Sequence, residues 1–215
     1  MSLADFQRAL ADLVSSPDLC GCVRTDSPGV LDRYTLTARE RSRIVAIVNQ
    51  RGMSVNCTLY RSSRFEALYT LLPLTCLILG DQLRAELDQY WRFREHSDLQ
   101  FRTEVAYWTE FLWCRMRAGH VNNPYLREVL SYEVAAIDLS YGSGPELRIV
   151  AFSHDPTIML SALRERRMPP LDVPSGAYYL LLAYRGGRLR VARINAELAR
   201  AVAAQSVIVD DALTR

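Results

Sequence analysis

The hydrophobic pattern of the chain changes its period near residue 142. Before that point apolar residues recur every three or four positions, the spacing of helices that are buried along one side. The apolar runs that follow are short and rich in branched residues, as in strands: Leu147–Phe152, Ala177–Tyr184 and Arg188–Ile194. The turn-forming stretch Gly142–Pro145 separates the two patterns. The sequence therefore predicts an α+β fold, with a multi-helix domain over residues 1–141 and a small strand–helix–hairpin–helix domain over residues 145–215.

Capping residues predict where several helices begin and end. Thr37-Ala-Arg-Glu40 is a capping box, and Ser63-Arg-Phe-Glu66 repeats the pattern. Gly52 predicts the end of the helix that follows Thr37, because glycine readily adopts the left-handed conformation of a helix terminus. Pro73 predicts a kink or an interruption, because proline has no amide donor. Further helix starts are predicted at Asp81, Asp98, Asn123-Pro124 and Asp155-Pro156.

Both ends of the chain also have readable patterns. Residues 2–14 alternate apolar and charged positions at helical spacing, whereas residues 15–36 lack a period and predict a long connection with one short helical turn. Gly186-Gly187 lies between two strand-like runs, which predicts a tight hairpin. In that hairpin Leu180, Leu182 and Tyr184 are expected to share a face with Leu189 and Val191. A final helix is predicted over residues 195–205.

Composition limits the classes of function. The 215 residues include 49% hydrophobic residues, enough for a buried core, and carry a formal net charge of only +2. That charge gives no reason to expect a nucleic-acid partner. The N-terminus lacks the features of a secretory signal, and no apolar run approaches the ~20 residues that cross a bilayer. Five scattered cysteines fit a reducing compartment, so we expect a cytoplasmic protein without a membrane span.

No constellation of catalytic or metal-binding residues stands out. The pair Cys20-Gly21-Cys22 has no second pair to complete a zinc site. His96, His120 and His154 are isolated from one another, each without a partner at helical spacing. We therefore assign neither a catalytic residue nor a metal ligand. An enzyme that uses Cys114, with His120 as its base, or the Cys20 pair remains a minor alternative.

Several motifs resemble a known family. The segment Asn56–Trp91 contains Thr58-Leu-Tyr-Arg61, Leu72-Pro-Leu-Thr-Cys76 and Leu79-Gly80, and Phe6-Gln-Arg-Ala-Leu10 precedes it. Their order and spacing are similar to those of the partner subunits of multinuclear non-heme iron oxidases, which act in the biosynthesis of ribosomally made peptide natural products. Within that family the chain most resembles partners from the 3-thiaglutamate pathway. The similarity covers the helical two thirds by motif, and the remainder only by its strand–helix–hairpin character.

The resemblance implies a function for the whole chain. In such systems the oxidase holds the iron and modifies a C-terminal cysteine of a carrier peptide, while the partner recognises the peptide. The chain is thus expected to be non-catalytic, with no cofactor of its own, and to form a hetero-oligomer with the oxidase and the precursor peptide.

The hairpin and the Thr58–Arg61 motif supply the candidate binding residues. An unfolded leader peptide binds well by adding a strand to a sheet edge, so the hairpin is the candidate peptide site. Peptide-binding residues are predicted to be Tyr179, Arg190, Arg193 and Arg200. Oxidase docking, or guiding of the peptide carboxylate, is predicted for Tyr60, Arg61 and Arg64. The structural alternatives are a core tyrosine, solvated surface arginines and salt bridges within the helical domain.

A second class of function is left open by the sequence. The same family motifs also occur under a DNA-binding description, the isoelectric point is about 8.3, and Arg39, Arg41 and Arg43 lie near one helix start. A helical DNA-binding regulator would accordingly bind duplex DNA with a steep dependence on salt concentration.

Overall fold

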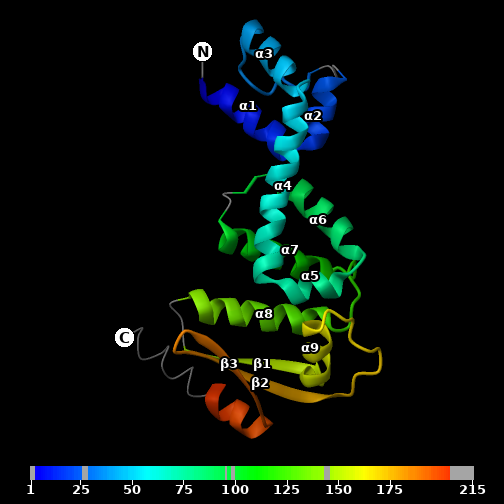
Figure 1. The fold of residues 1–215 in the computed structure, drawn as a ribbon, viewed down its shortest axis with the longest axis vertical. Helices are drawn as coiled ribbons and strands as arrows, with labels where there is room; N and C mark the ends of the chain where they lie inside the picture. The colour runs from blue at the N-terminus through cyan, green and yellow to red at the C-terminus, as the bar shows by residue number, and fades with distance from the viewer. Residues whose placement is uncertain (1–2, 26–28, 95, 98–99, 143–145, 204–215) are drawn as a thin grey trace. The chain divides into compact units, whose positions relative to one another are not determined.

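The computed structural model describes residues 3–25, 29–94, 96–97, 100–142 and 146–203. The helices of the first part are α1 (Leu3–Ser15), α2 (Pro17–Arg24), α3 (Ala38–Val48), α4 (Arg51–Leu71), α5 (Pro73–Leu79), α6 (Gln82–Phe93), α7 (Phe101–Arg117) and α8 (Leu126–Tyr141). They are followed by β1 (Leu147–His154), α9 (Pro156–Arg164), β2 (Ser175–Arg185), β3 (Arg188–Ile194) and a helix over residues 196–203 (Figure 1). The predicted α+β class is confirmed.

The chain folds into two compact units whose sequences interleave. Unit 1 comprises residues 1–68 and 84–108, and unit 2 comprises residues 69–83 and 109–215. This division differs from the boundary predicted between residues 141 and 145, because α5 and α8 pack with the sheet of unit 2. Residues 143–145 themselves lie outside the described residues. Among the described helices, none is long and apolar enough to cross a membrane.

The first half of unit 1 is a cluster of α1, α2, α3 and the start of α4. The predicted capping box is present at α3: the Thr37 hydroxyl accepts from the Glu40 amide, and the Glu40 carboxylate accepts from the Thr37 amide at 2.8 Å. Apolar faces of the four helices meet in one core, which contains Ala9, Leu13, Cys20, Val23, Leu31, Tyr34, Ile44, Val48, Met53 and Cys57.

The helix α4 is continuous where the sequence predicts a break. Gly52 lies inside its first turn rather than ending α3, which stops at Val48 with Asn49 as its cap. Ser63 lies in the middle of α4, so the predicted second capping box is wrong. Pro73 does interrupt the path, because α4 ends at Leu71 and α5 begins with the proline in its first turn, where no amide donor is required.

Two other helix starts also differ from their predictions. The segment between α1 and α3 contains an eight-residue helix, α2, because Ser16 accepts from the Leu19 amide and Pro17 occupies the first position. Asn123 accepts from the Tyr125 amide at 3.0 Å, but the helix α8 begins only at Leu126. The predicted cap Asp98 lies outside the described residues, whereas Asp155 caps α9 as predicted by accepting from the Thr157 amide.

Unit 2 is built around a three-stranded antiparallel sheet in the order β1-β2-β3. The two-residue loop Gly186-Gly187 joins β2 to β3, and both glycines have positive φ, as the predicted hairpin requires. The predicted register is confirmed, since Leu182 faces Val191 and Tyr184 faces Leu189.

One face of the sheet is covered by helices. Val150, Phe152, Leu180 and Leu182 are buried on this face, and the ring of Phe152 lies 6.5 Å from that of Tyr132 on α8. The helix at residues 196–203 lies on the opposite side of the sheet from α8 (Figure 1). The apolar residues of alternating sheet positions thus build the core of unit 2.

Candidate functional site

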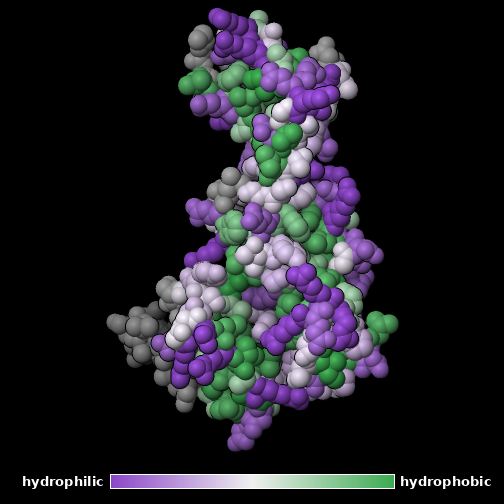
Figure 2. Space-filling model, in the orientation of Figure 1, coloured by the Kyte–Doolittle hydropathy of each residue, from purple (hydrophilic) through white to green (hydrophobic). Residues whose placement is uncertain are grey.

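The strand β3 is an edge of the sheet and is largely exposed. Five of its seven residues are exposed, and its sequence contains three arginines and no acidic residue. An antiparallel edge strand directs every second amide and carbonyl away from the sheet, where another strand could bind them. In Figure 2 hydrophilic residues gather at the hairpin end of this region. The edge therefore has the geometry for strand addition.

The register divides the predicted peptide-binding residues between the two faces. Arg190 faces Ala183, and Tyr179 faces Ile194, so these residues lie on the face away from α8. Tyr179 is half-buried there, and Arg190 is exposed. At the loop end of the same face Arg185 and Arg188 stand directly opposite each other. Like charges in that position are destabilising, so an acidic ligand would relieve a repulsion already present in the hairpin.

Arg193 and Arg200 differ from Arg190 in their surroundings. The guanidinium of Arg193 donates to the Asp155 carboxylate at 3.2 Å and lies 4.7 Å from the Tyr178 ring centre. It therefore connects β3 to the cap of α9. Arg200 is exposed in the helix at residues 196–203, where its Nε donates to the Ala196 carbonyl. The sheet thus brings Tyr179 and Arg190 onto one face and places Arg193 on the other.

The predicted docking residues also separate into different environments. The Arg64 side chain is 1% exposed, and its Nε donates to Glu104 at 2.7 Å. Its guanidinium also donates to the Arg94 carbonyl at 2.9 Å. The half-buried Tyr60 hydroxyl accepts from the Ser97 amide at 2.8 Å. Arg64 and Tyr60 therefore hold unit 1 together, and Arg64 is too buried to meet a partner.

Arg61, in contrast, lines a cavity of about 290 Å³ in unit 1. The cavity is lined by Pro17, Cys20, Arg24, Ser54, Cys57, Thr58 and Arg61. No acidic residue is among them. Arg24 donates through Nε to the Val48 carbonyl, and Arg61 stacks 5.0 Å from the Trp91 ring centre. Its nearest carboxylate oxygen, on Asp88, is 3.9 Å away, beyond hydrogen-bonding distance. The buried Arg61 Nε has no hydrogen-bond partner among the described residues.

The cavity is suited to an anionic group. Two guanidiniums supply donors in the planar fork that matches a carboxylate. Sequence reasoning finds Arg61 but misses Arg24, because the helix that carries Arg24 was taken for a connection. The signal was Ser16-Pro17, a cap followed by proline, which is the same signature that predicts α9.

The two thiols of this cavity are poor nucleophiles. The Sγ atoms of Cys20 and Cys57 are 4.0 Å apart and both residues are buried. Burial, together with the neighbouring Cys57, raises the pKa of Cys20 to about 12, so it stays a thiol at neutral pH. Cys22 is exposed, so Cys20 and Cys22 do not share an environment. Groups of three or more potential metal ligands are absent from the described parts of the chain.

The arginines behind the DNA-binding alternative lie on α3. Figure 2 shows hydrophilic residues gathered over this helix. Arg41 is bound to Asp32, with 2.8 Å between Nη1 and Oδ1, so part of this charge is neutralised within unit 1. Arg39 and Arg43 are exposed.

Comparison with protein-family models finds no match for the chain, and comparison with curated protein sequences finds none either.

Proposed function

We propose that the chain is a non-catalytic partner protein that binds a ribosomally made carrier peptide and presents its C-terminal residue to a multinuclear non-heme iron oxidase. The family motifs of the sequence suggest this function, with a cysteine as the presented residue. The observation that carries it in the structure is the exposed basic edge strand β3. Iron and catalysis belong to the oxidase in this account.

The edge strand supports recognition of an acidic leader peptide. Strand addition gains affinity from main-chain hydrogen bonds and specificity from alternate side chains. On the face away from α8 those alternate positions include Arg188 and Arg190, with Tyr179 as an apolar contact two strands from the sheet's other edge. Acidic leader side chains opposite the arginines would form favourable cross-strand pairs.

The Arg24–Arg61 cavity supports a second role in unit 1. A peptide that ends in cysteine carries a carboxylate at its terminus, and this cavity has two guanidiniums without an acidic residue in its lining. We infer that it receives a carboxylate of the peptide or of the oxidase. Tyr60 and Arg64, which the sequence groups with Arg61, act by shaping unit 1.

Reversal of charge on β3 is expected to weaken peptide binding. In Arg188→Glu/Arg190→Glu, each lost charge-assisted contact is worth about 1.5–3 kcal/mol, so affinity should fall about ten- to a hundredfold or more. Fluorescence anisotropy with the labelled leader of the peptide encoded beside the oxidase gene measures it. Arg43→Glu, an exposed reversal on α3, is the charge-matched control. Equal affinity in both variants would contradict the proposal.

Neutralisation of the cavity is expected to change turnover rather than leader binding. Arg61→Met keeps an apolar stem beside Trp91 but removes the carboxylate contact. We expect a loss of about tenfold or more in oxidation of the full-length peptide by the oxidase complex. The affinity for the isolated leader should stay unchanged. An unaltered rate, measured on a variant whose melting temperature equals that of the parent, would show that the cavity has no part in the function.

A further inference from the structure

A second cavity, in unit 2, surrounds a buried carboxylate. It has a volume of about 500 Å³ and is lined by Met116, Val121, Asn122, Asn123, Pro124, Arg127, Glu128 and Ser153. That volume lies within the range of small-molecule sites. Glu128, on α8, is 6% exposed. No motif of the sequence analysis includes it, and the proposed peptide site does not use it.

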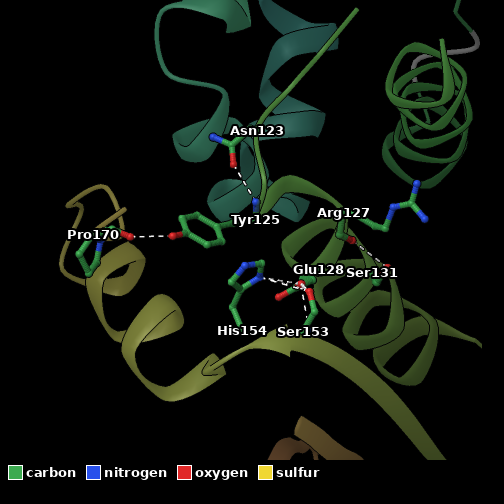
Figure 3. Close-up of polar contacts among 8 residues, drawn as sticks. All are labelled: Asn123, Tyr125, Arg127, Glu128, Ser131, Ser153, His154 and Pro170. Carbon is green, nitrogen blue, oxygen red and sulfur yellow. Dashed lines mark hydrogen bonds and ion pairs between the residues drawn. The ribbon is translucent and has the colours of Figure 1, made fainter. Parts of the chain in front are cut away.

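Three donors converge on one oxygen of Glu128. Its Oε1 accepts from the Ser153 amide at 3.1 Å, from the Ser153 hydroxyl, and lies 3.0 Å from His154 Nδ1 (Figure 3). The other oxygen, Oε2, is buried and has no hydrogen-bond partner among the described residues. A buried polar atom left in this way costs about 1–3 kcal/mol, and more for a charged group. Glu128 is therefore only half satisfied by its own protein.

An irregularity in β1 builds this arrangement. Neighbouring strand residues normally point to opposite faces, but the pairing of β1 with β2 shifts register between Phe152 and His154. Ser153 and His154 consequently both reach Glu128 (Figure 3). Bulges of this kind often re-aim side chains next to functional sites. The Tyr125 ring, held by its hydroxyl bond to the Pro170 carbonyl, packs edge-on against His154 at 4.9 Å.

The arrangement differs from that of a serine nucleophile. In a catalytic triad the histidine bridges serine and acid through its two different nitrogens. Here Ser153 gives its hydrogen bond to Glu128, and His154 approaches both residues with the same nitrogen, Nδ1. The cluster fixes the carboxylate rather than activating the hydroxyl. Its chemistry is that of a binding group.

We propose that this cavity binds a ligand through a cationic nitrogen group, an alkylammonium or a guanidinium, with Glu128 as its anionic contact. Donors of the ligand would satisfy the oxygen that lacks a partner. Met116, Val121 and Pro124 supply an apolar lining for the aliphatic stem that carries such a group. The proposal goes beyond the proposed function and does not depend on it.

Arg127 does not oppose a cation at Glu128. Its guanidinium lies 5.7 Å from the Trp113 ring centre, and Figure 3 shows it directed away from Glu128 and His154. The positive charge of Arg127 is thus held on the α7 side of the cavity. An anionic ligand would have to approach a buried carboxylate, which disfavours it.

Titration with small cations tests the proposal by amide NMR. The probes are n-butylammonium, methylguanidinium and the blocked peptide acetyl-Gly-Lys-Gly-amide, with sodium acetate as the anionic control. We expect saturable shifts of the Ser153 and His154 amides with at least one cation and none with acetate. Strong binding of the peptide alone would identify a basic side chain as the source of the cation, and binding of the small cations alone would identify a free ligand.

Two variants and one control separate binding from folding. Glu128→Gln should weaken the cation at least about tenfold, because a charge-assisted contact becomes a neutral one. Asn122→Trp fills the exposed rim while leaving Glu128 in place, and should also abolish binding. Asp138→Asn removes the same charge from an exposed position on α8 and should bind as the parent does. No saturable shift with any cation, or equal binding by a folded Glu128→Gln or Asn122→Trp, would overturn the proposal.

Discussion

Replacement of Arg64 by methionine is expected to lower the free energy of unfolding by about 3–5 kcal/mol. Arg64 and Glu104 are 1% and 2% exposed, and 2.7 Å separates Arg64 Nε from Glu104 Oε1. Removal of the arginine leaves Glu104 buried without its counter-charge. It also removes the donor to the Arg94 carbonyl, which joins α4 to the end of α6. Urea unfolding followed by tryptophan fluorescence measures the loss, since Trp108 is fully buried in unit 1.

A double replacement distinguishes loss of the ion pair from loss of packing. Arg64→Met/Glu104→Leu removes both charges and keeps apolar volume, so it should recover most of the stability that the single change loses. Arg43→Met, at an exposed position of α3, should stay within about 0.5 kcal/mol of the parent. A single variant that loses less than about 1 kcal/mol would show that the pair is not the organising contact of α4.

The stability of unit 2 is expected to fall as the pH rises from about 4.5 to about 7. Glu133 accepts from the Leu74 and Thr75 amides, at 2.7 Å each, and thereby caps α5. Its burial nevertheless raises its pKa from 4.5 to about 7, although these hydrogen bonds oppose the shift. The folded state therefore holds the proton more tightly than the unfolded state. Over this window the free energy of unfolding should decline by about 3 kcal/mol in total and then level off.

A variant without the ionisable group isolates this contribution. Glu133→Gln should remove the decline, whereas Glu110→Gln, an exposed change on α7, should retain it. Amide hydrogen exchange at Leu74 and Thr75, measured across this pH range and corrected for intrinsic exchange, gives a local measurement. A decline of the same size in Glu133→Gln would assign it to another group.

Local sequence signals predicted much of the fold. The capping residues of α3 and α9 and the Gly186-Gly187 hairpin depend on neighbouring residues only, so their geometry follows from short motifs. The strand register followed as well, since alternation fixes which residues share a face. These features need no knowledge of distant parts of the chain.

The failures have a common physical cause in long-range contacts. The buried stripe of α4 runs from Met53 and Cys57 through Arg64 to Leu68. Its middle member is an arginine, so the apolar pattern appears broken there and Ser63 resembles a new cap. Only Glu104, 40 positions away, makes burial of that charge possible. The sequence therefore could not show that α4 continues.

The candidate site was predictable only in part for the same reason. The motif that contains Arg61 was found in the sequence, but its neighbour Arg24 comes from another helix. On the hairpin the arginines were found, yet the Asp155 contact of Arg193 depends on the packing of α9 against the strands. Side-chain type and spacing identify candidates, and the tertiary contacts decide which of them remain available to a ligand.

Hydrogen exchange of β3 in the presence of peptide is the most direct test of the proposed function. The chain is measured alone and with the cysteine-ended peptide encoded beside the oxidase gene. If the peptide adds a strand to the sheet, amides of Leu189–Ile194 should become protected, and Arg188→Glu/Arg190→Glu should lose that protection while Arg43→Glu keeps it. Peptide binding that leaves these amides unprotected, or the absence of any binding to the peptide, would contradict the account.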